Sequence, residues 1–62
     1  MSYLQDCIME YLRQHPEGAD LKTIAEGIGS RKEVLWTSIR GLERFKLVES
    51  RPAGARKIWR AI

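Results

Sequence analysis

A chain of 62 residues is long enough for one small domain and too short for a two-domain enzyme. With 44% hydrophobic and 31% charged residues, it is neither a disordered tail nor a fibre. Cys7 is the one cysteine, which excludes an intrachain disulfide. The sequence has no run of about 20 apolar residues, and its acidic first residues do not fit a secretory leader. We expect a single domain over residues 1–62, located in the cytoplasm and without a membrane partner.

The net charge of +3 is unevenly distributed along the chain. Residues 1–30 contain two basic and five acidic residues, a net charge of −3, whereas residues 31–62 contain nine basic and three acidic residues, a net charge of +6. A segregated basic half favours a polyanionic partner, and nucleic acid before a membrane, because no predicted helix combines a basic face with a broad apolar one. The alternative is a charged surface that only provides solubility.

The first predicted helix begins after Ser2 and ends at His15. Ser2 and Gln5 match the capping-box pattern S-x-x-Q, and the residue before Pro16 disfavours helical backbone angles. Between these ends, apolar side chains recur at three- and four-residue intervals and form one stripe of a helix: Leu4, Cys7, Ile8, Tyr11 and Leu12.

A second, short helix is predicted between Asp20, which can cap its start, and Gly29, which provides the left-handed exit that helix ends favour. Its apolar stripe consists of Leu21, Ile24, Ala25 and Ile28. Only Ser30 separates it from a third helix, for which Ser30 and Glu33 form a second capping box. The short connection predicts a helix-turn-helix.

The third helix divides into two faces at about 100° per residue. The predicted core face contains Val34, Leu35, Ser38, Ile39, Leu42 and Phe45. The predicted outward face contains Lys32, Trp36, Thr37, Arg40, Glu43 and Arg44.

Two extended runs follow, Leu47–Arg51 and Arg56–Ile62, around the turn residues Pro52–Ala55. Gly18–Asp20 is a candidate for a third, minimal strand. The predicted fold class is α+β, mainly α, a winged helix-turn-helix with three helices followed by a two-stranded β-hairpin wing.

The segment DLKTIAEGIGSRKEVLWTSIRGLERFKLVES, followed by a hairpin that ends in KIWRAI, resembles the winged helix DNA-binding domains of bacterial and archaeal transcription regulators. It is also similar to the Zalpha domain, a relative that binds left-handed nucleic acid. The Zalpha family uses an Asn and a Tyr on its recognition helix where this chain has Trp36 and Arg40, so a preference for left-handed DNA is not expected. Many relatives carry Gly after this helix, at the position of Lys46.

The resemblance and the charge distribution together predict a small transcription regulator that binds double-stranded DNA. The third helix is expected in the major groove and the basic wing on the backbone or minor groove. Thr37 and Arg40 are expected to contact base edges, since the Arg fork can reach guanine O6 and N7 together. The other predicted DNA-binding residues are Arg31, Lys32, Trp36, Arg44, Arg51, Arg56 and Lys57.

The two tryptophans receive different predictions. Trp36 lies on the outward helical face, where it packs on the hairpin, contacts DNA or forms a partner interface, in that order of preference. Trp59 is predicted to be structural, an aromatic that bridges the last strand to the third helix.

The sequence does not support an enzyme, a cofactor or a metal site. His15 lies at a helix end, Cys7 has no second soft ligand at usable spacing, and the pair Gly27 and Gly29 follows a helix where a phosphate-binding loop follows a strand.

Two alternatives to DNA binding stay open at this point, a winged helix that serves as a protein interaction module within a larger complex and an RNA-binding winged helix. A regulator needs more than one reading head, so we expect a homodimer or a larger protein assembly. The predicted homodimer contact is the surplus apolar surface of the first helix at Tyr3, Met9 and Leu12.

Overall fold

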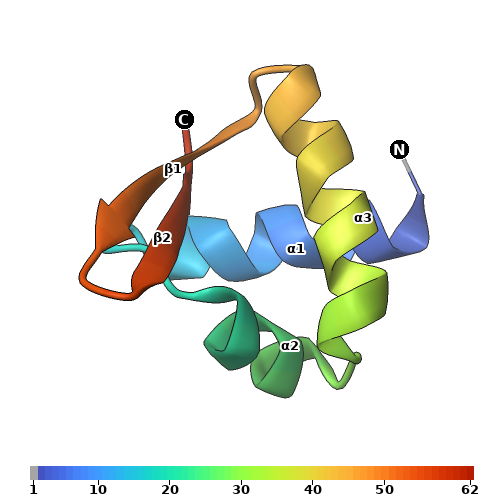
Figure 1. Cartoon of the computed structure of the whole chain (residues 1–62). Helices are drawn as coiled ribbons and strands as arrows, with labels where there is room; N and C mark the ends of the chain where they lie inside the picture. Colours follow the sequence, from blue (N-terminus) through green and yellow to red (C-terminus); the bar gives the residue numbers. More distant parts are fainter. Residues whose placement is uncertain (1) are drawn as a thin grey trace.

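The computed structural model describes residues 2–62, which form three helices followed by a β-hairpin (Figure 1). The helices are α1 (Tyr3–Gln14), α2 (Leu21–Ile28) and α3 (Lys32–Arg44). The strands β1 (Val48–Ala53) and β2 (Arg56–Ala61) pair antiparallel. This arrangement confirms the predicted fold class. Among the described residues, no helix has both the length and the hydropathy that a membrane crossing requires.

The predicted starts of the first two helices are confirmed. The Gln5 backbone N–H donates to Ser2 Oγ at 3.2 Å, and the Ser2 N–H donates to Gln5 Oε1 at 3.1 Å. Asp20 caps α2 by accepting a hydrogen bond from the Thr23 backbone N–H at 2.8 Å. These side chains satisfy N–H groups that have no partner within a helix.

The predicted capping box at Ser30 is wrong. The Ser30 N–H donates to the Ala25 carbonyl at 2.9 Å, so this residue closes the end of α2 behind the left-handed Gly29. The N-cap of α3 is Arg31, which makes no side-chain capping hydrogen bond.

The end of α3 places Lys46 in the left-handed region, at φ 61°. The Leu47 N–H donates to the Leu42 carbonyl at 3.0 Å and the Lys46 N–H to the Glu43 carbonyl at 2.9 Å, the pattern of a Schellman motif. Lysine therefore occupies the position that favours glycine, as the sequence comparison suggests.

All three helices and both strands contribute to one hydrophobic core. Its fully buried large side chains are Ile8, Leu12, Ile24, Leu35, Ile39, Leu42, Val48 and Trp59. The prediction for the core face of α3 was wrong at Val34 and Phe45, which are exposed. Phe45 follows the last helical residue, where the chain leaves the stripe, and Val34 lies about 100° from Leu35.

The predicted homodimer contact on the first helix loses two of its three residues. Met9 and Leu12 are buried, because α2, α3 and β2 all pack against α1 and cover a wider arc than one stripe. Tyr3 is exposed. The sequence pattern underestimated how much of α1 the fold covers.

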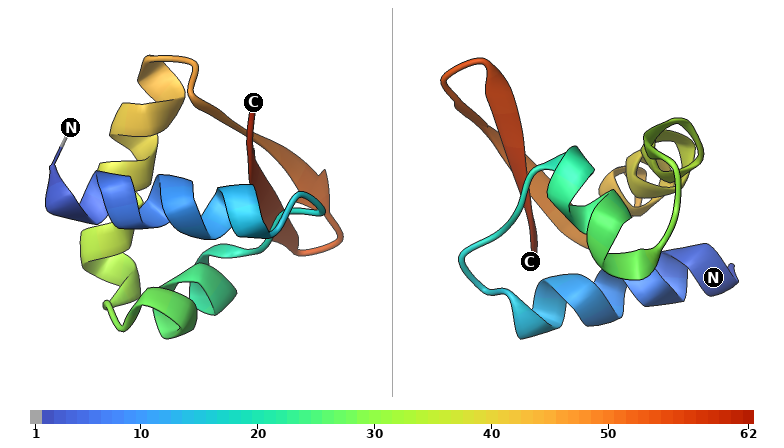
Figure 2. Two further views of the ribbon diagram at one scale, coloured as in Figure 1. Left: turned by 180° about the vertical axis from the view of Figure 1, so that it is seen from behind. Right: turned by 90° about the horizontal axis from the view of Figure 1, so that it is seen from below.

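The turn of the wing is shorter than predicted, and the two strands have equal lengths. Pro52 and Ala53 belong to β1, and the pairing of Ala53 with Arg56 leaves a two-residue loop that begins at Gly54, with φ 65°. The candidate third strand is present as a bridge, in which Ala19 and Trp59 exchange both backbone hydrogen bonds at 2.8 and 2.9 Å. Figure 2 shows that α3 and the wing tip lie on one side of the molecule and α1 on the opposite side.

Candidate nucleic-acid interface

The outward face of α3 carries the middle of the predicted interface. Lys32, Trp36 and Arg40 are spaced four residues apart, which places them along one line of the helix surface. Thr37 and Arg44 are also exposed, as is Arg31, the N-cap of this helix. The predicted wing residues are exposed as well: Arg51, Arg56 and Lys57. All the residues of the predicted interface are therefore accessible to a ligand in the free chain.

Trp36 packs against the wing while keeping part of its surface in solvent. Its ring meets that of Trp59 edge to face, with centroids 6.2 Å apart and an interplanar angle of 79°. Trp36 is 39% exposed and Trp59 only 1%. The predicted packing of Trp36 on the hairpin and the predicted structural role of Trp59 are confirmed. This contact joins the wing to α3 at the edge of the core.

Arg40 is held by two neighbours on the same helix. Its guanidinium carbon lies 5.1 Å from the centre of the Trp36 ring, within the range of a cation–π interaction. Its Nε lies 3.2 Å from Glu43 Oε1, and the Arg40 side chain is 56% exposed. The guanidinium is thus oriented on the α3 surface and remains open to solvent.

A groove of about 400 Å³ lies where α2, α3 and β2 meet. Among the described residues that line it are the rings of Trp36 and Trp59, one carboxylate, that of Asp20, and four cations: Lys22, Lys32, Arg56 and Lys57. The groove brings together cations that the sequence analysis assigned separately to the helix and to the wing.

Asp20 is held firmly in this groove. Besides capping α2, it accepts a hydrogen bond from Arg56 Nη1 to its Oδ2 at 2.9 Å, and its side chain is only 12% exposed. Hydrogen bonds from Thr23 are the main cause that lowers the pKa of Asp20; Arg56 adds to the effect, and burial opposes it. The carboxylate is therefore ionised at neutral pH.

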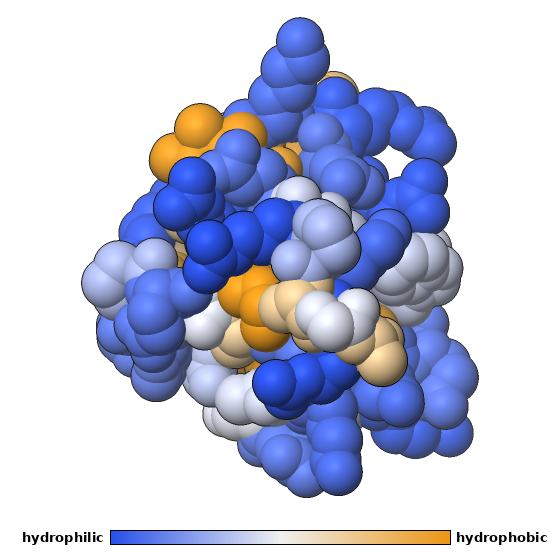
Figure 3. Space-filling model, turned by 60° about the vertical axis from the view of Figure 1, so that its left-hand side comes forward, coloured by the Kyte–Doolittle hydropathy of each residue, from blue (hydrophilic) through white to orange (hydrophobic). Residues whose placement is uncertain are grey.

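The wing residues do not all reach this groove. Arg51 pairs with Ile58 across the hairpin, and side-chain alternation places both on the face opposite Trp59. There Arg51 lines a shallow hollow of about 160 Å³ together with Ile58 and Arg60, whose Nε donates to Glu49 Oε2 at 2.6 Å. Seen from the hairpin side, hydrophilic side chains cover most of the surface, and apolar ones form only small patches (Figure 3).

No protein-family model matches the chain, and no curated protein matches it. Solved structures do. The chain superimposes over its whole length on MepR, a transcription regulator of the Staphylococcus aureus multidrug efflux pump MepA, with a TM-score of 0.93 and 23% identity. The corresponding values for the PcaV transcriptional regulator from Streptomyces coelicolor are 0.94 and 22%. It also matches the Zalpha domain of Carassius auratus PKZ, solved in complex with Z-DNA, with a TM-score of 0.84 and 24% identity over 95% of this chain and 92% of that one.

The chain has the winged-helix fold. It spans only about half of the two bacterial regulators, 47% of MepR and 45% of PcaV. At these identities the similarity establishes the fold alone. The function of the surface is therefore argued from the residues of this chain.

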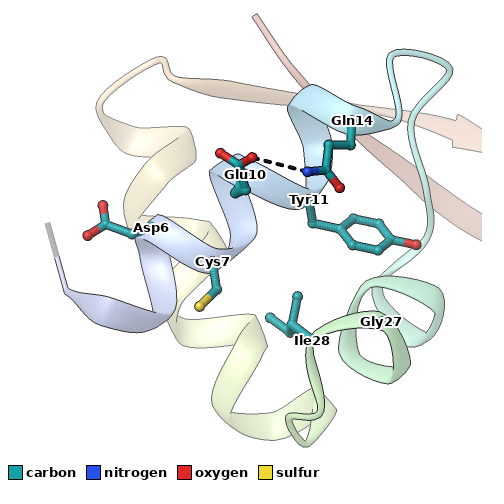
Figure 4. Close-up of a pocket in the computed structure, with 7 residues that line it drawn as sticks. All are labelled: Asp6, Cys7, Glu10, Tyr11, Gln14, Gly27 and Ile28. Atoms are coloured by element: carbon teal, nitrogen blue, oxygen red, sulfur yellow. Dashed lines mark hydrogen bonds between the residues drawn. The ribbon is translucent and has the colours of Figure 1, made fainter.

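The winged helix has a second groove, of about 490 Å³, between α1 and α2 (Figure 4). Asp6 and Glu10 give it an acidic rim, and the Glu10 carboxylate accepts a hydrogen bond from Gln14 Nε2 at 3.1 Å. Within residues 2–62, no three His, Cys, Asp or Glu side chains lie close enough to hold a metal ion. The acidic rim does not favour nucleic acid, in contrast to the basic groove between α2, α3 and β2.

Two residues of the basic groove were missed by the sequence analysis. Lys22 lies in the acidic half of the chain, and Asp20 was interpreted only as a helix cap. Neither has a local signal in the sequence, because the short turn joins the end of the second helix to the third, and the first turn of the second helix reaches the groove only in the folded chain. β2 approaches this turn through the bridge between Ala19 and Trp59, for which the sequence predicts only a minimal third strand.

Proposed function

We propose that this chain is a single winged-helix domain that binds double-stranded DNA as a small transcription regulator, in the cytoplasm. One observation carries the proposal: the cations of α2, α3 and the wing converge on one groove beside the oriented pair of Trp36 and Arg40, on the side of the molecule to which the wing tip extends. Converging cations are what a phosphate backbone requires, and an adjacent exposed helix is what a major groove admits.

Within this proposal the residues have different tasks. Arg40 and Thr37 contact base edges, and Trp36 covers the sugar or a thymine methyl while its inner edge stays on the wing. The cations of the groove and of the helix ends contact phosphates: Lys22, Arg31, Lys32, Arg44, Arg56 and Lys57. Arg51, on the other face of the wing, contacts the adjacent backbone. The proposal is one of binding and assigns no catalytic residue, cofactor or metal.

The experiment is a fluorescence anisotropy titration with a duplex obtained by binding-site selection and with a random duplex of equal length. Arg40→Ala is expected to cost roughly 1–3 kcal/mol on the selected duplex and less on the random one, since a base contact discriminates between sequences. Arg13→Ala is the matched control, because Arg13 is an exposed arginine in the last turn of α1 and does not line the basic groove.

Equal losses on both duplexes would move Arg40 to the phosphate contacts. Affinity of the unaltered chain that does not change with salt would refute nucleic-acid binding altogether, because release of counterions makes such binding fall as salt rises.

A second candidate is a protein interaction module, favoured by the apolar surface near the end of α3. Phe45 is 74% exposed and Ile62 73%, and the Ile62 N–H donates to the Leu47 carbonyl at 3.1 Å. These side chains offer a contact for a second copy in a homodimer or for another protein. Sedimentation equilibrium at micromolar concentration, compared with Phe45→Ser, tests it: a monomer in both samples would exclude the homodimer.

A further inference from the structure

The ion pair between Asp20 and Arg56 joins a largely buried carboxylate to an exposed guanidinium. Both carboxylate oxygens of Asp20 are engaged, by Thr23 and by Arg56, and the side chain is 12% exposed. The Arg56 side chain is 67% exposed and lies next to the two-residue loop at the wing tip. The arginine can therefore leave the pair at little cost, whereas the carboxylate is held by the helix that it caps.

The surroundings of the pair favour a further anion. One carboxylate faces four cations in the groove, which gives the lining a net charge of +3 when Asp20 is ionised. A guanidinium binds a carboxylate and a phosphate with the same planar fork, so the two compete for Arg56. Lys22, Lys32 and Lys57 attract a phosphate to the same place.

We propose that the groove between α2, α3 and β2 binds one phosphate group of the nucleic-acid backbone, and that Asp20 holds Arg56 in the free protein and releases it to that phosphate. The inference rests on the proposed function and adds to it a defined phosphate site and a residue that opposes its occupation. Asp20 thereby weakens binding to every duplex, whatever its sequence, and leaves discrimination to α3.

The decisive variant is Asp20→Asn. Asparagine caps helices about as well as aspartate, so α2 keeps its first turn while the charge that holds Arg56 is removed. We expect binding to any duplex to become about fivefold tighter, which corresponds to about 1 kcal/mol at 1.4 kcal/mol per factor of ten. We also expect the slope of log affinity against log salt to steepen by up to about one unit.

Glu49→Gln is the matched control. It removes the same charge from a carboxylate–arginine pair outside the groove, the more exposed pair of Glu49 with Arg60 at 2.6 Å on the other face of the wing. The groove hypothesis predicts an affinity within twofold of the unaltered chain. An equal gain in both variants would show that net charge alone matters and would overturn the proposal.

A double variant tests the route through Arg56. In an Arg56→Gln background the gain from Asp20→Asn should vanish, since the two residues act on each other. A gain that persists there would overturn the proposal, as would a single variant that binds no better than the original. Circular dichroism melting curves establish that every variant is folded at the temperature of the titration.

Inorganic phosphate separates this inference from the proposed function. We expect the Arg56 Nε–H resonance to shift at lower phosphate concentration in Asp20→Asn than in the unaltered chain. If no form of the chain binds duplex with a salt-dependent affinity but this shift occurs, the phosphate site stands and DNA binding fails. If duplexes bind but phosphate shifts Arg56 equally in both forms, DNA binding stands and the role of Asp20 fails.

Discussion

Substitutions at two helix ends test whether the backbone there adopts the left-handed conformation. α2 ends at Gly29 with φ 72° and α3 is followed by Lys46 with φ 61°, so the same left-handed turn is made once by glycine and once by lysine. We expect Lys46→Gly to stabilise the chain and Gly29→Ala to destabilise it by a similar amount.

The magnitude follows from two opposing effects. A residue with a Cβ atom in the left-handed region costs roughly 1–2 kcal/mol. Glycine, however, has more freedom in the unfolded chain, which offsets about 0.4–1 kcal/mol. A Cβ atom at Gly29 meets no atom within 4 Å, so no steric clash adds to its cost. The net change is about 0.7 kcal/mol with opposite signs at the two positions, or about 3–6 °C in Tm for a domain of this size.

The assay is thermal and urea denaturation followed by circular dichroism. Lys46→Ala is the reference for Lys46→Gly, because it removes the same charge from the end of α3 but keeps the Cβ atom. If Lys46→Gly is no more stable than Lys46→Ala while Gly29→Ala loses stability, Lys46 is not left-handed in solution. If neither position responds, the energetic argument itself is wrong.

Three further outcomes can be checked by denaturation followed by circular dichroism and, for the tryptophans, by fluorescence emission. Gly18→Ala should cost more than Gly29→Ala, by about 1–3 kcal/mol, because Gly18 has φ 87° and an added Cβ atom would lie 2.8 Å from the Trp59 carbonyl oxygen; equal costs would contradict this. Asp20→Ala should lose about 1 kcal/mol at pH 7. Because the hydrogen bonds from Thr23, and to a lesser extent Arg56, lower the pKa of Asp20 on folding, the part of that loss that depends on its charge exists above the unfolded pKa and disappears as the pH falls through the folded pKa; a loss independent of pH in urea titrations would contradict the lowered pKa. Trp36→Ala should cost about 2 kcal/mol and shift the fluorescence of Trp59 to the red, whereas unchanged Trp59 emission would mean that the rings do not touch.

The helices could be predicted from the sequence because their signals are local. Ser2 with Gln5, and Asp20 followed by an apolar stripe, specify where helices begin through contacts three residues apart. Ser30 shows the limit of this reasoning: the same serine fits the end of one helix and the start of the next, and only the folded turn decides between them.

The groove could not be predicted in full, because it depends on contacts between distant segments. Asp20 and Arg56 are 36 positions apart in the chain and meet because Ala19 pairs with Trp59. The burial of Met9 also has a long-range cause, since three other elements cover α1. A charge count located the basic half of the chain and could not reveal that Lys22, in the acidic half, joins it.

The burial of Trp59 has a consequence for how this surface can change. Successive side chains of a strand point to opposite faces, so a slip of one residue in the pairing of β2 would turn Trp59 out to solvent and Lys57 away from the groove. The core thereby fixes the register of the wing, because in a misaligned hairpin the core would lose Trp59, its largest buried side chain. Side chains on the outer face, such as Arg51 and Arg60, are under no such control. Substitutions that change the charge of these side chains therefore leave the geometry of the groove unchanged.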